Sequence, residues 1–178
     1  MDKRLGGRGS LLYYYPRLLY EFLFFGFIGL VVETLYVVFM TGKWTIRGSL
    51  GYGLPIIHIY GFGCLIVVYL LGRYKERPIL FYLLSTAFMT GVELTGSYME
   101  EFYTGHRSWN YSNKPFNFQG RVCLSSSLAW GTMAFLTVFV FHPEIRRILR
   151  RIPRKVLVLS SVFLTGYILV VTWLKYMV

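Results

Sequence analysis

The feature that most constrains this chain is a series of long apolar runs, separated by connections that carry most of its charge. A membrane-spanning helix needs roughly 20 mostly apolar residues. With 55% hydrophobic and 19% aromatic residues, the composition is typical of a small multi-pass membrane protein. The runs cover residues 18–40, 56–71, 79–97 with an extension to 103, 122–141 and 156–177. They predict an all-α fold, a polytopic membrane helical bundle of about five transmembrane helices.

The basic residues indicate how the chain is oriented. The formal net charge is +11, and most Lys and Arg residues flank apolar runs. Thirteen of them lie in the N-terminal segment and in the second and fourth connections, against six elsewhere. The positive-inside rule therefore predicts a cytoplasmic N-terminus and an outer C-terminus. We attribute the charge to topology and to contact with membrane lipids, in a bacterial plasma membrane, and we expect no nucleic-acid partner.

The runs and their connections divide the chain into four predicted segments. Residues 1–17 form a basic cytoplasmic N-terminus, and residues 18–143 form a four-helix membrane core with an outer loop at 103–121. Residues 144–155 are predicted to form a basic amphipathic surface helix, ended by Pro153, and residues 156–178 form the fifth transmembrane helix. The basic helix is either an anionic-lipid anchor or a docking site for a cytoplasmic partner.

Similar features follow one another in the same order in the first two runs and in the next two. Each half has a glutamate in its first helix, then a Thr-Gly and a tryptophan, an arginine beside a glycine, and an aromatic-glycine pair. In the first half these lie at Glu33, 41–44, 47–48 and 60–61, and in the second at Glu93, 104–109, 120–121 and 130–131. The pattern predicts a duplicated two-helix unit, related by an axis along the membrane normal.

Polar residues inside and beside the membrane give the candidate site. Glu33 is expected about 10 Å, and Glu93 about 15 Å, below the outer ends of their helices, at a rise of 1.5 Å per residue. Ionisable groups at such depth are expensive and normally have partners, and the longest polar interruption of the chain, residues 103–131, supplies arginines and aromatics. The predicted substrate-binding residues are Glu33, Tyr36, Arg47, Glu93, Glu100, Arg107, Trp109, Tyr111, Asn117 and Arg121.

Three functions fit such a cluster. It is a binding or transport site for a small solute or lipid, or a structural network of an assembly or sensor subunit. As a third alternative, it belongs to a membrane enzyme acting on a lipid-linked substrate, with Glu93 or Glu100 as base and the arginines as phosphate clamps. The two cysteines form no Cys-x-x-Cys pair, and no metal or other cofactor is expected.

Several motifs between residues 24 and 143 carry a family resemblance. They include Gly-Leu-Val-Val-Glu at 29–33, Trp-Asn-Tyr-Ser at 109–112, Pro-Phe-Asn at 115–117 and Gly-Arg at 120–121. On these residues the chain resembles the ABC transporter permease family of CmpB type, although Asn110 stands where that family's pattern has Asp. The resemblance implies a multi-pass transport component. A Gly-x-x-x-x-Gly-Lys-Ser/Thr motif is absent, so an ATP-driven role implies a separate ATPase as cytoplasmic partner. Because five spans are few for a complete pathway, a homo-oligomer is expected.

Overall fold

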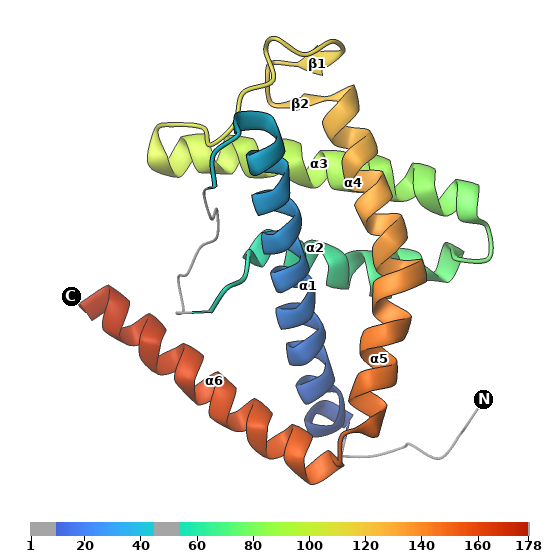
Figure 1. Ribbon diagram of the computed structural model, residues 1–178, viewed down its shortest axis with the longest axis vertical. Helices are drawn as coiled ribbons and strands as arrows, with labels where there is room; N and C mark the ends of the chain where they lie inside the picture. The colour runs from blue at the N-terminus through green and yellow to red at the C-terminus, as the bar shows by residue number, and fades with distance from the viewer. Residues whose placement is uncertain (1–9, 45–53, 178) are drawn as a thin grey trace. The chain divides into compact units, whose positions relative to one another are not determined.

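The computed structural model describes residues 10–44 and 54–177, and most of them are helical (Figure 1). The main helices are α1 (Ser10–Thr41), α2 (His58–Ile66), α3 (Pro78–Thr104), α4 (Leu124–Leu136), α5 (His142–Arg151) and α6 (Arg154–Met177). Two short strands, β1 (Asn117–Phe118) and β2 (Val122–Cys123), pair antiparallel in the outer loop. The chain forms two compact units, residues 1–65 with 144–178 and residues 66–143.

Four helical segments are long and apolar enough to cross a membrane, which confirms an all-α polytopic membrane protein. They are Tyr14–Phe39, Pro78–Thr104, Leu124–Arg151 and Arg154–Val171. The predicted second span corresponds to a shorter apolar helix, His58–Tyr74. It consists of α2, a π-helical turn η1 (Val67–Leu71) and a 3-10 turn η2 (Gly72–Tyr74). The orientation predicted from the basic residues stays a prediction.

The fourth predicted helix continues past the expected stop at His142-Pro143. Helix α4, the π-helical turn η3 (Thr137–Phe141) and α5 follow one another to Arg151 without an interruption. Proline normally breaks a helix because it lacks the N–H donor and crowds the preceding turn. Here the wider π turn comes immediately before it, with the N–H of His142 bonded to the carbonyl of Thr137. This local change in winding accommodates Pro143. The predicted surface helix is therefore the end of a longer helix.

In the first unit, close contacts between small and aromatic residues join α1 to α2. A Cβ atom added at Gly61 would lie 2.6 Å from the ring of Phe22, and one added at Gly29 would lie 2.2 Å from Tyr60. Gly61 therefore allows α2 to approach α1 closely, as small residues do between membrane helices. Helix α6 joins the same unit through a hydrogen bond of 2.7 Å from the Tyr20 hydroxyl to Ser160 Oγ.

In the second unit, α3 packs against α4. Phe81 is fully buried, and its ring centroid lies 5.5 Å from that of Phe139 in an edge-to-face arrangement. Gly131 of α4 lies against Thr86 of α3, because an added Cβ there would be only 1.9 Å from the threonine Oγ1. These contacts fix the two helices on which the outer loop is built.

Candidate functional site

The predicted outer loop, residues 105–123 between α3 and α4, is a folded segment held by its own hydrogen bonds. The backbone N–H of Tyr111 donates to the carbonyl of Gly120 at 2.7 Å, and the Asn117 side-chain amide donates to the carbonyl of Lys114 at 2.8 Å. The Asn110 side chain accepts a bond of 2.9 Å from the backbone N–H of Ser112, which forms an Asx turn. The predicted site residue Asn117 therefore shapes the loop.

Glu93 of α3 accepts hydrogen bonds from the loop and from α4. The Tyr111 hydroxyl donates to Oε1 at 3.1 Å, and the Ser126 hydroxyl donates to Oε2 at 3.0 Å. The Trp130 side chain donates a third bond. The glutamate is only 4% exposed, so these donors replace the water that a carboxylate would otherwise bind. Such a carboxylate joins α3, α4 and the loop, and its burial does not favour a role as general base.

Arg121 of the loop inserts beside the C-terminal end of α3. Its guanidinium donates to the carbonyl and the hydroxyl of Ser97, at 3.2 and 3.1 Å, and forms an ion pair with Glu101. The guanidinium carbon also lies 3.9 Å from the ring centroid of Tyr98, in a cation–π contact. Arg121 is 8% exposed, and its carbonyl accepts a bond of 2.9 Å from the Trp109 indole. This arginine is the main anchor of the loop.

A second layer of charged contacts lies nearer to solvent. The Arg107 guanidinium lies 3.6 Å from Glu101 and donates to the carbonyl of Gln119 at 3.2 Å. Glu100 accepts a bond of 3.0 Å from the backbone N–H of Ser108 and another from the hydroxyl of the same residue. The Glu101 and Arg107 side chains keep 40% and 29% of their surface exposed. A ligand could reach both of these charged groups.

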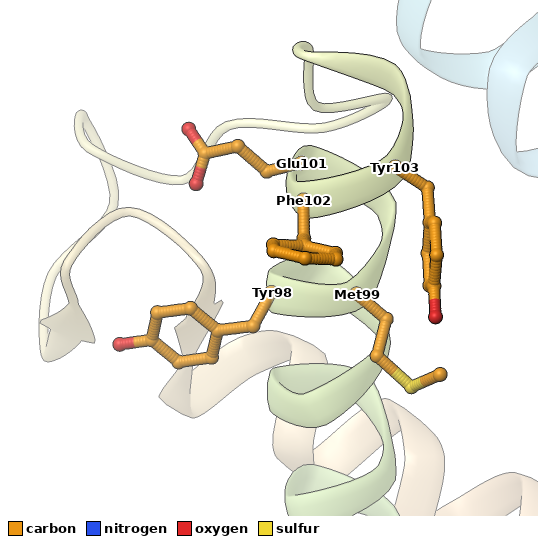
Figure 2. Close-up of a pocket in the computed structure, with 5 residues that line it drawn as sticks. All are labelled: Tyr98, Met99, Glu101, Phe102 and Tyr103. Atoms are coloured by element: carbon orange, nitrogen blue, oxygen red, sulfur yellow. The ribbon is translucent and has the colours of Figure 1, made fainter.

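An open pocket of about 520 Å³ lies on the last turns of α3, beside this ion pair (Figure 2). In Figure 2, Tyr98 and Glu101 point to the side of the helix on which the loop is drawn, whereas Met99 and Tyr103 point to the other side. The lining residues are Tyr98, Met99, Glu101, Phe102 and Tyr103. We call these five residues the aromatic shelf.

The structure brings together most of the residues predicted from the sequence. Those in the second unit, on α3 and its loop, are Glu93, Glu100, Arg107, Trp109, Tyr111, Asn117 and Arg121. Glu33 and Tyr36 belong to the first unit, where Glu33 accepts a bond of 3.0 Å from Tyr60 and Tyr36 is half exposed. Arg47 lies outside the described residues. A single cluster containing both glutamates therefore stays a prediction.

Sequence reasoning missed several partners of the carboxylates. Tyr60 and Trp130 lie in the aromatic-glycine pairs of the predicted repeat, and nothing in the sequence marks them or Ser126 as donors to a glutamate. Glu101 was overlooked although it lies beside the predicted Glu100, and its pairing with two arginines depends on how the loop folds back. Glu21 of α1 is a further buried acid, 1% exposed. Among the described residues, no three His, Cys, Asp or Glu side chains are grouped so that they could hold a metal ion.

Comparison with known families agrees with these features. The model of the family described as Putative ABC-transporter type IV matches residues 20–175, nearly the whole chain. The chain belongs to this family. It is therefore a multi-pass membrane protein of a transporter family, as its motifs predicted. No curated protein and no solved structure matches the chain.

Proposed function

We propose that this protein is a permease component that binds a lipid or a small amphiphilic solute at the outer end of α3. The observation that carries the proposal is the aromatic shelf beside a partly exposed ion pair. Phe102 and Tyr103 are 82% and 76% exposed, so most of the surface of each side chain makes no contact within this chain. Aromatic side chains at such positions suit the membrane interface, where one end of a ligand is apolar and the other is solvated.

The charges of the site favour a ligand with a polar head. Glu101 and Arg107 present both signs of charge at the edge of the shelf. Arg121 is already committed to Ser97 and Glu101 and is buried, so it positions Glu101 and is not expected to touch the ligand. The pocket volume of about 520 Å³ lies within the range of small-molecule sites. An amphiphile would lay its apolar part on Phe102 and direct its head to Glu101 and Arg107.

The cytoplasmic part of this proposal concerns a partner ATPase. The family model describes an ABC transporter, and the sequence carries no phosphate-binding loop of its own. Helix α5 presents exposed arginines at 146, 147, 150 and 151, while Ile145 and Leu149 are buried. The exposed basic face is therefore the surface that we expect an acidic cytoplasmic partner or anionic lipids to contact.

Native mass spectrometry of the full chain, extracted gently with its lipids, tests the shelf. Phe102→Ala should reduce the bound amphiphile several-fold, whereas Phe163→Ala should not. Phe163 is a matched control because it is also an exposed phenylalanine, 78% accessible, on helix α6. For the head group, Glu101→Gln should weaken binding and Glu144→Gln, on an exposed i,i+3 pair with Arg147, should not.

The outcome that opposes the proposal is equally specific. If the wild type carries no bound lipid or solute, or if all four variants retain it equally, the shelf is not a binding site. The polar network around it would then be structural, and the assembly or sensor function would replace the permease function.

A further inference from the structure

We infer that the chain contains two copies of one helix-pair unit. The pair formed by Glu33 and Tyr60 in the first copy corresponds to the pair formed by Glu93 and Trp130 in the second. The first copy is α1 with α2 and η1, and the second is α3 with α4 and η3 (Figure 1). Adding 60 to a residue number in α1 gives its counterpart in α3, and adding 70 to one in α2 or η1 gives its counterpart in α4 or η3.

The crossing of the two helices is built in the same way in both copies. In the first, Phe22 of α1 lies against Gly61, and its ring centroid is 4.7 Å from that of Phe62. In the second, the counterpart of Phe22 is Tyr82, which lies 3.3 Å from a Cβ added at Gly131. The Tyr82 hydroxyl is also 3.3 Å from the hydroxyl of Thr132, the counterpart of Phe62. One aromatic residue therefore occupies equivalent surroundings in each pair.

The carboxylates are held in the same way. Glu33 and Glu93 are counterparts, and so are Tyr60 and Trp130, which follow the 60 and 70 offsets. In the first copy the Tyr60 hydroxyl donates to Glu33 at 3.0 Å, and in the second the Trp130 side chain donates to Glu93. In both, an aromatic donor on the second helix holds a glutamate of the first. We call each such pair a clamp.

The second helices also share their winding and their burial. The π-helical turns η1 (Val67–Leu71) and η3 (Thr137–Phe141) are 70 positions apart, and each closes with a bond to its own first carbonyl, from Gly72 N–H and from His142 N–H. Counterpart positions are mostly buried or exposed together. The buried pairs include Gly61 and Gly131, Cys64 and Ala134, Val67 and Thr137, and Val68 and Val138; the exposed pairs include Ile66 and Leu136, and Tyr69 and Phe139.

The first helices end with the same cap. Gly42 and Gly105 both have positive φ, 66° and 73°, the left-handed conformation that favours glycine after a helix. The preceding threonine hydroxyls donate back to the carbonyls of Val37 and Glu100, at 2.8 and 2.7 Å. The offset between the copies is 60 in the first helices, 63 at these caps and 70 in the second helices, so the second copy is ten residues longer. These ten residues lie partly in α3 and mostly in the loop that follows it. The loop of the candidate site is thus the part in which the copies differ.

Duplication gives the clamps a common role. Duplicated helix units are, in many transporters, the bodies that move against one another. A body that moves as a unit has to keep its own two helices together. A hydrogen bond to a carboxylate in an apolar setting serves this purpose because the unpaired group would be costly. This inference does not depend on the aromatic shelf or on its ligand.

The test exchanges the aromatic donors in the full-length protein. Tyr60→Phe and Trp130→Phe each remove a donor and should each lower the apparent Tm, by about 3–10 °C if one charged-group hydrogen bond is lost. Tyr60→Trp and Trp130→Tyr install the donor of the other copy and should recover most of that loss. Cys64 and Cys123 are buried, so the reaction of a thiol-reactive fluorophore reports unfolding in detergent without relying on tryptophan emission.

Double variants that change a donor and its acceptor together distinguish loss of the hydrogen bond from loss of packing. In a Glu33→Gln background, Tyr60→Phe should cost markedly less than in the wild type, and the same should hold for Trp130→Phe in Glu93→Gln. Equal coupling in the two pairs supports two equivalent clamps. Coupling in only one pair, or exchange variants as damaging as the phenylalanine variants, overturns the inference. If a variant at Trp130 does not fold, a Tyr60 series that shows neither coupling nor rescue still overturns it.

Discussion

Replacing Gly131 by alanine tests the closest contact between α3 and α4. The new Cβ would lie 1.9 Å from Thr86 Oγ1 and 3.1 Å from Thr86 Cβ, both shorter than an ordinary van der Waals contact. The threonine hydroxyl cannot turn aside freely, because it donates a bond of 2.8 Å to the carbonyl of Tyr82. Either the hydroxyl gives up this bond or the two helices separate.

Three contributions determine the size of the effect, and two of them destabilise the protein while the third stabilises it. Overpacking a well-packed contact costs about 1–3 kcal/mol, and losing the threonine hydrogen bond costs about 0.5–1.5 kcal/mol. Alanine favours the helix over glycine by about 0.8–1 kcal/mol, which offsets part of this cost. The expected net loss of stability is about 1–3 kcal/mol. For a chain of this length it corresponds to a decrease in Tm of about 2–12 °C.

The assay is thermal unfolding of the detergent-solubilised protein at a fixed scan rate, since unfolding of such proteins is often irreversible. Gly91→Ala on α3 is the control, because a Cβ there meets no atom within 4 Å and its Tm should stay equal or rise. Thr86→Ala combined with Gly131→Ala should recover most of the loss. If Gly131→Ala is as stable as Gly91→Ala, or if Thr86→Ala restores nothing, Gly131 does not lie as close to Thr86 as these distances indicate.

Two further predictions concern the loop. Arg121→Ala removes buried hydrogen bonds of a charged group and should lower the free energy of unfolding by about 1–3 kcal/mol. The control Arg147→Ala breaks an exposed ion pair and should change Tm by less than about 2 °C. Equal effects of the two variants would contradict the role of Arg121 as the anchor of the loop. Burial raises the pKa of the Cys123 thiol, but its hydrogen bonds, led by that with Ser125, together bring the pKa below the ordinary value. In a Cys64→Ser background, Ser125→Ala should therefore move the pH midpoint of the thiolate ultraviolet absorbance upward, measured as a difference spectrum against the variant that also lacks Cys123; an unchanged midpoint would refute this cause.

The balance of charge in the loop limits what the site can do. Arg121 and Arg107 both contact Glu101, so neither guanidinium is an isolated anion site. Glu93 is surrounded by neutral donors and is nearly inaccessible. A ligand at this end of α3 therefore meets the exposed aromatic residues and the outer ion pair first. This arrangement favours an amphiphile over a free phosphate or a metal ion.

The sequence could predict the helices well because apolar length and charge placement act locally. A run long enough to cross the membrane must satisfy its backbone hydrogen bonds internally, and that condition alone requires a helix. It could not predict that the fourth helix passes through Pro143. The π-helical turn that accommodates this proline is a choice among windings with similar local energies, and packing decides it.

The candidate site shows the same division. From sequence, the polar loop and the membrane glutamates were recognisable as a candidate site, because charged groups at that depth require partners. Whether Tyr111 reaches Glu93, and which partners Glu100 and Glu101 have, depends on how a loop of nineteen residues, 105–123, folds back onto α3. The glycine at 120, with a φ of 67°, lets that loop turn and place Arg121 against Ser97.

Sequence by itself thus determined the class of protein and its family, and it singled out Glu93 and Arg121 among the buried charged residues. These properties depend on hydrophobicity and on motif spacing, which a linear chain displays directly. Tertiary structure alone decided that Glu101 pairs with both arginines, that Trp130 and Tyr60 hold the two glutamates, and that Phe102 is left exposed. Each of these depends on which helix faces meet, because a hydrogen bond or an ion pair forms only when the three-dimensional fold brings its two groups within a few ångströms.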